Sequence, residues 1–183
     1  MVIAYHAIWT TYGTWLPNDP RGSYSKAAYS AALRALGEVK YGRQAPQPDW
    51  EVLQRFRAAA TPRLSRPRYF ITEATRPVVA AALGRLSRAM GLAVRACSIM
   101  DDHVHLVVMR SRFRIEYVMN QLKGAGTRAL AAGRTPWTRN GWKVFLDDME
   151  AVYAAMRYVE ANPPAAGPPP QQWDFVEPLP PGA

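Results

Sequence analysis

The chain has 183 residues, of which 49% are hydrophobic, and its 23 Lys and Arg outweigh its 14 Asp and Glu to give a net charge of +9. This length allows one domain with a buried core and an insertion, and the basic balance favours a polyanionic partner such as nucleic acid. No segment approaches the ~20 consecutive apolar residues that cross a membrane, and the single cysteine excludes an internal disulfide. We therefore expect a cytoplasmic protein with no membrane partner.

The N-terminal part of the chain predicts one strand followed by a long insertion. Residues 2–12 are rich in β-branched and aromatic side chains, which is typical of a strand. A turn cluster at 15–22, with two prolines, Asn, Asp and Gly, ends that strand. Alanine-rich helical pieces near 26–37 and 49–60 then alternate with proline and arginine. We expect about 17–74 to form a basic, exposed insertion.

From Thr75 onward, the spacing of apolar residues alternates between that of helices and that of strands. Thr75 is a predicted N-cap, and Asp101-Asp102 predicts a tight hairpin turn between two strands. The predicted elements, in chain order, are a helix from Thr75 to about Met90, strands at 92–100 and 103–109, a helix over about 113–132, a strand at 142–146, and a helix from Asp147 or Asp148 to about Asn162.

Without the insertion, this order is β-α-β-β-α-β followed by one more helix. It predicts an α+β fold of the ferredoxin-like, split βαβ kind, whose antiparallel sheet has one face covered by the first two of these helices. We expect residues 1–162 to form this single domain, with the last helix available to the other face. Residues 163–183 include eight prolines and predict an extended or disordered tail.

The strand predicted at 103–109 contains two of the three histidines of the chain. Because side chains on a strand alternate between its faces, His103 and His105 project from the same face about 7 Å apart. Two imidazoles at this spacing can bind one metal ion if a third ligand arrives from another element. The His-x-His pattern by itself is equally compatible with a structural role, so the third ligand decides the interpretation.

The last predicted helix carries two polar side chains beside its apolar face. Tyr158 and Asn162 are four residues apart and are therefore neighbours on the helix surface. An amide oxygen suits a hard divalent ion, and a phenol can act as a nucleophile. Alternatively, Tyr158 could serve only in packing, and Asn162 could only end the helix before Pro163. The apolar stripe expected to pack on the sheet consists of Met149, Val152, Met156 and Val159.

Four segments resemble the single-tyrosine HUH transposases, and the REP-associated tyrosine transposases most closely. They are MDDHVHLVV around His103, QLKGAGTRAL in the following helix, YVEANP at Tyr158, and the N-terminal YHAIWTTYGTWLPNDPRG. The resemblance covers most of 3–20 and 75–163. It implies that His103, His105 and Asn162 bind Mg²⁺ or Mn²⁺ and that Tyr158 attacks a DNA phosphodiester. Insertion-sequence members usually carry Gln where this chain has Asn162, whereas Asn-Pro is typical of the REP-associated branch.

The expected function is metal-dependent nicking and strand transfer on single-stranded DNA, of hairpin or repeat type, through a 5′-phosphotyrosine intermediate and a free 3′-OH. A duplex phosphate is awkward to attack in line, which favours a single-stranded or hairpin substrate. Unpaired bases stack on aromatic side chains, and basic side chains follow the phosphates. The enzyme is expected to be a monomer or a homodimer. The residues predicted to contact DNA are Trp15, Arg21, Lys123, Arg128 and Lys143.

Two other functions stay open from the residues alone. One is a non-catalytic single-stranded nucleic-acid-binding module derived from such an enzyme, although the aromatic pattern of an RRM sheet is missing. The other is a two-histidine phosphoesterase that uses water. It would need a second His-x-Thr or His-x-Ser motif, which His6-Ala7-Ile8 does not supply. His6 could face the same site as His103 and His105, but we favour its interpretation as a satisfied strand histidine.

Overall fold

The computed structural model describes residues 1–28, 30–167, 169–177 and 179. The chain divides into two compact units. The first, here called the sheet unit, consists of residues 1–10 and 70–183, and the second, the insertion unit, consists of residues 11–69. Among the described residues, none of the helices combines the length and the apolar character needed to cross a bilayer.

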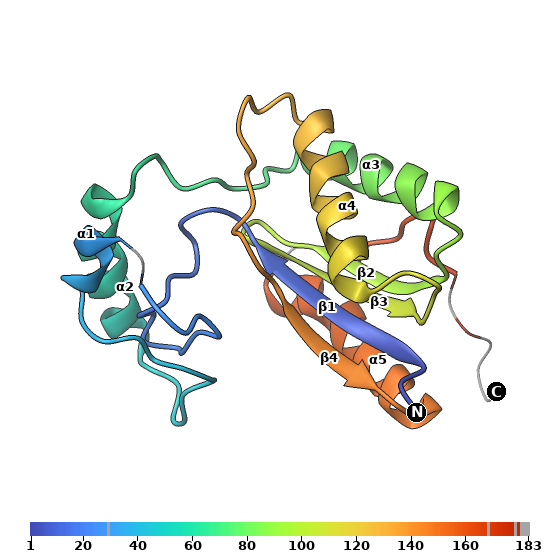
Figure 1. Ribbon diagram of the computed structural model, residues 1–183, viewed down its shortest axis with the longest axis horizontal. Coiled ribbons are helices and arrows are strands. Elements are labelled where there is room, and N and C mark those ends of the chain that lie inside the picture. Colours follow the sequence, from blue (N-terminus) through green and yellow to red (C-terminus); the bar gives the residue numbers. More distant parts are fainter. Residues whose placement is uncertain (29, 168, 178, 180–183) are drawn as a thin grey trace. The chain divides into compact units, whose positions relative to one another are not determined.

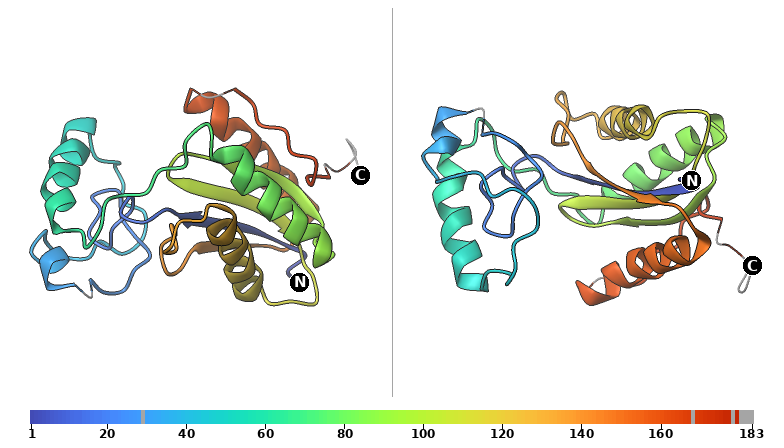
Figure 2. Two further views of the ribbon diagram at one scale, coloured as in Figure 1. Left: turned by 90° about the horizontal axis from the view of Figure 1, so that it is seen from above. Right: turned by 60° about the horizontal axis from the view of Figure 1, so that its bottom comes forward.

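The sheet unit is built on four antiparallel strands in the order β2-β3-β1-β4. Helices α3 and α4 lie on one face of the sheet and α5 lies on the other (Figures 1 and 2). This arrangement confirms the predicted α+β fold of the split βαβ kind with an additional C-terminal helix. The elements are β1 (Ala4–Thr10), α3 (Arg76–Ala89), β2 (Val94–Ile99), β3 (His103–Met109), α4 (Ile115–Ala129), β4 (Trp142–Leu146) and α5 (Met149–Ala165).

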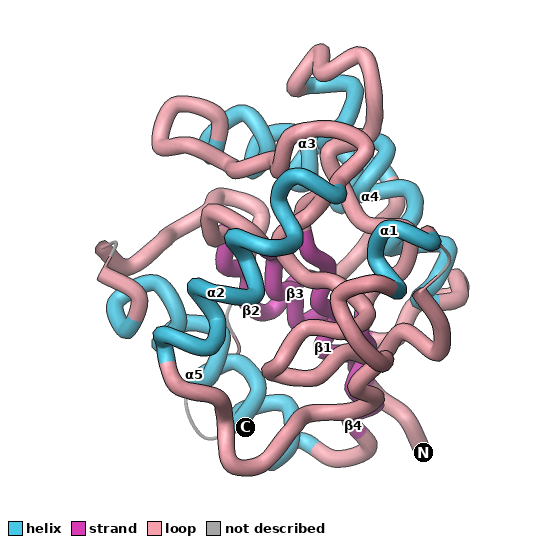
Figure 3. Tube along the Cα trace, turned by 90° about the vertical axis from the view of Figure 1, so that its left-hand side faces the viewer, coloured by secondary structure: helices cyan, strands magenta, loops and turns pink. Residues whose placement is uncertain are grey.

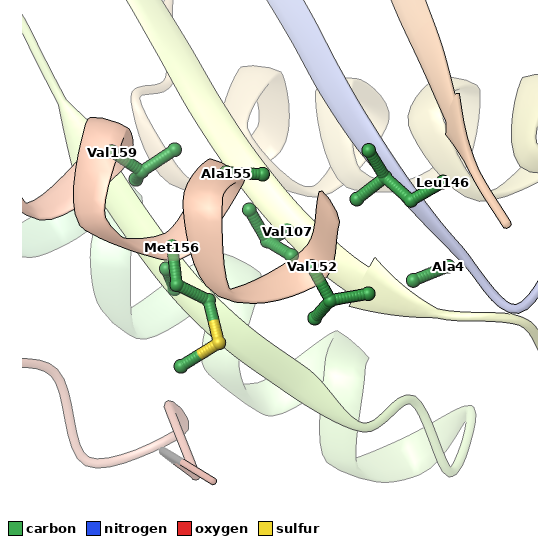
Figure 4. Close-up of a cluster of buried hydrophobic side chains, with 8 residues drawn as sticks. Ala4, Val107, Leu146, Val152, Ala155, Met156 and Val159 are labelled. Atoms are coloured by element: carbon green, nitrogen blue, oxygen red, sulfur yellow. The ribbon is translucent and has the colours of Figure 1, made fainter. Parts of the chain in front are cut away.

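The face of the sheet under α5 has an apolar half, which holds the helix in place. Figure 4 shows side chains of α5 directed at the strands. Val107 of β3 is fully buried there, whereas its neighbours Leu106 and Val108 point to the α3 and α4 side because strand side chains alternate. The predicted stripe of α5 is confirmed, with Met149 only partly buried. The buried cluster consists of Ala4, Ala96, Val107, Leu146, Val152, Ala155, Met156 and Val159.

The ends of two helices differ in how they are capped. In α5, the backbone N–H of Ala151 donates to Oδ1 of Asp148 at 2.7 Å, which confirms Asp148 as the cap. Thr75 occupies the predicted N-cap position of α3, but its backbone is helical and its hydroxyl makes no cap bond to the helix. That hydroxyl instead accepts the N–H of Thr72 at 2.8 Å. Helix α5 continues past Asn162 to Ala165, so Pro163 lies within its last turn.

The described part of the tail runs along the outer edge of β2 rather than being disordered. The backbone N–H of Ile99 donates to Oε1 of Gln171 at 2.7 Å, and Nε2 of Gln171 donates back to the Ile99 carbonyl at 2.9 Å. Further on, Val176 forms a parallel bridge with Val94. These bonds satisfy backbone groups that an edge strand would otherwise leave open.

The insertion unit contains two helices, α1 (Ala31–Arg34) and α2 (Trp50–Ala60), a 3₁₀ turn at Thr61–Arg63, and long loops, which are pink in Figure 3. The helix predicted near 26–37 is therefore only a single turn, whereas the one predicted at 49–60 forms. Asn18 organises the loops, since its buried amide donates to the carbonyls of Leu33 at 2.6 Å and Gly37 at 3.2 Å.

Phe175 anchors the tail, so its removal should destabilise the sheet unit. Its side chain is buried, and a Cβ added at Gly84 of α3 would lie 2.8 Å from its ring. We expect Phe175→Ala to lower the free energy of unfolding by about 3 kcal/mol, measured by urea denaturation. The exposed control, Gln172→Ala, should change it by less than about 0.5 kcal/mol.

A second substitution tests whether Phe175 and Gly84 are in contact. Gly84→Ala should destabilise the wild type, because the new methyl group meets the ring. In the Phe175→Ala background the same change should stabilise the protein by up to about 1 kcal/mol, because alanine favours a helix over glycine. Equal effects of Gly84→Ala in both backgrounds would contradict the packing of the tail on α3.

Candidate metal and nucleophile site

The pairing of β1 with β3 brings all three histidines of the chain to one face of the sheet. In this pair Thr10 lies opposite His103, Ile8 opposite His105, and His6 opposite Val107. Residues directly opposite each other on antiparallel strands share a face, and alternate residues along a strand do so as well. The face is that of Val107, which packs against α5. The three imidazoles therefore lie on the α5 side of the sheet.

The histidines contact one another closely. The ring centroids of His103 and His105 are 4.7 Å apart, and Nε2 of His6 lies 2.9 Å from Nδ1 of His105. His103 bonds through its Nδ1 to Oδ1 of Asp102 at 2.5 Å. The Nδ1 atoms of His103 and His105 are thus both engaged. Among the described residues, the Nε2 atoms of these two rings make no hydrogen bond.

Helix α5 places Tyr158 at the edge of this cluster. The Tyr158 ring lies 5.6 Å from the His105 ring and 5.8 Å from the His6 ring between centroids, in both cases edge-on. Tyr158 is 56% exposed, whereas Tyr153 of the same helix packs against the buried cluster. Asn162 lies one turn beyond Tyr158, and its Nδ2 donates to the Tyr158 carbonyl at 3.2 Å.

Burial keeps the two inner histidines neutral. It lowers the pKa of His6 to about 4. For His105, burial together with the nearby His103 and His6 lowers the pKa to about 2. Placing a positive charge on a ring removed from water is unfavourable, and neighbouring positive charge adds to that cost. Both rings are therefore uncharged near pH 7, and an uncharged imidazole is the form that binds metal ions.

The residues at the cluster fit a divalent ion by their chemistry. Two imidazole nitrogens and a carboxamide oxygen are donors that such ions accept. Ser98 lies opposite His105 across β2 and β3, and its buried hydroxyl has no hydrogen-bond partner in the described part of the chain. A polar ligand, or a water molecule bound to a metal ion, would give that hydroxyl a hydrogen-bond partner. No three His, Cys, Asp or Glu side chains of the described residues form a metal-binding group, so the ligand set of His103, His105 and Asn162 stays a prediction.

Both lysines that are predicted to contact DNA make internal bonds. Lys123 is buried, and its ammonium donates to the three carbonyls of residues 138–140 at 2.6, 3.0 and 3.3 Å. Burial lowers its pKa to about 8. An ammonium group has three hydrogens, so all of its donors are used within the sheet unit. Lys143 donates to Glu116 of α4 at 2.5 Å.

The two predicted DNA contacts of the insertion unit also have internal partners. The Arg21 guanidinium lies 3.7 Å over the Trp15 ring and pairs with Asp19 at 2.8 Å, and its side chain is only 14% exposed. Trp15 donates its indole N–H to the Gly22 carbonyl at 2.7 Å. Arg128 is exposed on α4. DNA contact by these five side chains stays a prediction.

The sequence left open whether His6 faces the site and favoured a structural role, and the structure brings His6 into contact with His105. Alternation along β1 shows which residues share a face with His6, but only the register with β3 shows what lies beside it. Asp102 carried a usable signal, because a carboxylate next to a ligand-like histidine commonly orients it. Ser98 carried none, since an isolated serine in an apolar strand has no distinctive pattern.

The low pKa of His6 makes the stability of the metal-free protein depend on pH. Between its folded pKa of about 4 and the unfolded value of 6.5, the unfolded state binds more protons, so stability falls as the pH falls through this window. For His6 we expect a loss of about 2 kcal/mol between pH 7 and pH 5. Urea denaturation should show a weaker pH dependence for His6→Gln than for the wild type. Identical pH dependence in both proteins would contradict burial of a neutral His6.

Comparison with known proteins gives a family match and several similar solved structures. Residues 63–149 match the family model described as Transposase IS200 like. This segment contains His103 and His105, whereas Tyr158 and Asn162 lie beyond it. No curated protein matches the chain significantly.

A solved structure of a REP-associated tyrosine transposase bound to a REP hairpin is similar over 90% of this chain and 68% of that one, with a TM-score of 0.52 and 10% sequence identity. A candidate transposase from Deinococcus radiodurans is similar over 88% of this chain and 91% of that one, with a TM-score of 0.45 and 15% identity. The first likeness shows a shared fold. Together with the family match over residues 63–149, it confirms the predicted resemblance to transposases.

Proposed function

We propose that this protein is a metal-dependent enzyme that nicks and rejoins single-stranded DNA, with Tyr158 as the nucleophile. One observation carries the proposal. The exposed Tyr158 ring lies against His105, which is one of the two histidines of the His-x-His motif. A tyrosine that is more than half exposed contributes little to core packing, and its position beside paired imidazoles favours a chemical role.

The chemistry assigned to Tyr158 is a transesterification. Its Oη attacks the phosphorus of a DNA phosphodiester, the bond from phosphorus to the 3′ oxygen breaks, and that oxygen leaves as a 3′-OH after taking a proton. The phosphate then joins Oη of Tyr158 to the 5′ end of the downstream strand. Attack by another 3′-OH reverses the step and joins two strands, so no nucleotide cofactor is required. A free phenol has a pKa near 10 and is a weak nucleophile at pH 7.

The residues around Tyr158 would supply the assistance that the phenol needs. We assign His103 and His105, through Nε2, and Asn162, through its amide oxygen, as the ligands of Mg²⁺ or Mn²⁺. When bound, such an ion stabilises the charge that develops on the phosphoryl oxygens. His105 is held neutral by burial, so it is ready to bind without first losing a proton.

The proposed substrate is single-stranded or hairpin DNA, used in the cytoplasm by a monomer or a homodimer. The net charge of +9 supports a polyanionic substrate. The similar solved structure is that of a transposase bound to a REP hairpin, which supports hairpin DNA as the first substrate to test.

The decisive experiment incubates the protein with labelled hairpin DNA and Mg²⁺ or Mn²⁺ and searches for a protein–DNA adduct that survives denaturation. We expect the wild type to form the adduct and Tyr158→Phe to form none, because phenylalanine lacks the attacking oxygen. Tyr153→Phe is the matched control on the same helix and should retain the adduct.

Each other outcome points to one of the alternative functions. DNA binding without any adduct in the wild type would favour a non-catalytic binding module. Cleavage that survives Tyr158→Phe but is lost in His103→Ala would favour a phosphoesterase that uses water. Either result would overturn the assignment of Tyr158.

The ligand role of Asn162 predicts a separate effect on metal binding. Asn162→Ala should weaken Mn²⁺ binding in calorimetric titrations, because one oxygen donor is removed. The exposed loop residue Asn140 offers a control, and Asn140→Ala should bind Mn²⁺ like the wild type. Unchanged Mn²⁺ affinity in Asn162→Ala would remove this residue from the ligand set.

A further inference from the structure

The contact between His6 and His105 links two strands directly at the candidate site. Nε2 of His6 lies 2.9 Å from Nδ1 of His105, and both rings are buried. Two neutral imidazoles share a single hydrogen across such a contact, so one ring is the donor and the other is the acceptor. Which ring donates decides which nitrogen of His105 keeps a lone pair.

The Nδ1 atom of His103 is also hydrogen-bonded, but its partner is a carboxylate. Its Nδ1 lies 2.5 Å from Oδ1 of Asp102. An ionised carboxylate can only accept, so Nδ1 of His103 carries the hydrogen, and a neutral His103 then has its lone pair on Nε2. Histidines that bind a metal through one nitrogen usually donate the other N–H to a partner, which fixes both the tautomer and the ring orientation.

We propose that His6 is a positioning residue that accepts the Nδ1–H of His105 and thereby keeps the Nε2 lone pair of His105 free to bind a metal ion. This inference rests on the proposed function, because the metal ion is part of that function. His6 acts on His105 as Asp102 acts on His103. Both histidines of β3 thus carry their hydrogen on Nδ1, which is held by His6 in one case and by Asp102 in the other.

His6 has a second contact that a test must separate from the hydrogen bond. The Tyr158 ring lies edge-on to His6 with 5.8 Å between centroids, so the shape of the His6 ring also supports Tyr158. Phenylalanine at position 6 keeps an aromatic ring of similar size but cannot accept a hydrogen bond. Glutamine lacks the ring, but its amide oxygen reaches the place of Nε2 and can accept one.

Mn²⁺ affinity, measured by calorimetry on the full chain, tests the proposal without any need for activity. We expect His6→Phe to bind Mn²⁺ about 10–100-fold more weakly than the wild type, the usual effect of losing such a partner. His6→Gln should restore most of the affinity. Circular dichroism of both variants checks that they are folded. A purely structural role of His6 predicts no rescue by glutamine, since glutamine fills the cavity less well than phenylalanine.

The tautomer of His105 is the second readout, and it needs neither metal nor DNA. Nitrogen-15 NMR of the metal-free protein, with His105 assigned by substitution, should show the hydrogen on Nδ1 in the wild type and in His6→Gln. In His6→Phe the hydrogen should move partly or wholly to Nε2.

Failure of this inference and failure of the proposed function give different results. A hydrogen on Nε2 of His105 in the wild type would overturn the role of His6, as would unchanged Mn²⁺ affinity in His6→Phe. Absence of Mn²⁺ binding by the wild type would overturn the metal-dependent function instead. In that case the NMR result would still decide which ring donates in the bond between His6 and His105.

Discussion

The antiparallel register between β1 and β3 is the constraint on which the candidate site depends. It sets His6 diagonally across from His105 and places both on the same face as His103. A shift of the register by one residue would turn one strand's set of side chains to the opposite face. The apolar residues of these strands resist such a shift, because Leu106 and Val107 are fully buried on opposite faces of β3.

Helix α5 covers a sheet face that is apolar in one half and carries the histidines in the other. It therefore contacts both the apolar cluster and the candidate site. Val152, Met156 and Val159 pack on the apolar half of the sheet. Tyr158, next to Val159 along the chain, points away from the cluster and reaches the histidines. The cap at Asp148 sets where the helix begins, and helical geometry then determines which residues come one and two turns later. The packing residues and the proposed nucleophile thus lie on adjoining faces of one helix.

The positive charge of the chain is only partly available to a partner. Lys123 closes the loop at 138–140 through three carbonyls, and Arg21 is paired with Asp19 and stacked on Trp15. A buried ammonium that satisfies several carbonyls stabilises a loop at the cost of its own hydration. The net charge therefore predicts the class of partner, but it does not show which side chains would meet that partner.

The sequence by itself determined the order of the elements, the apolar faces of α5 and β3, and the spacing of His103 with His105 and of Tyr158 with Asn162. These follow from local periodicity, which each segment carries alone. Only the tertiary structure decided that His6 contacts His105 and that the tail covers the edge of β2. Such contacts join residues far apart in the chain, and their energies depend on register and packing that no single segment encodes.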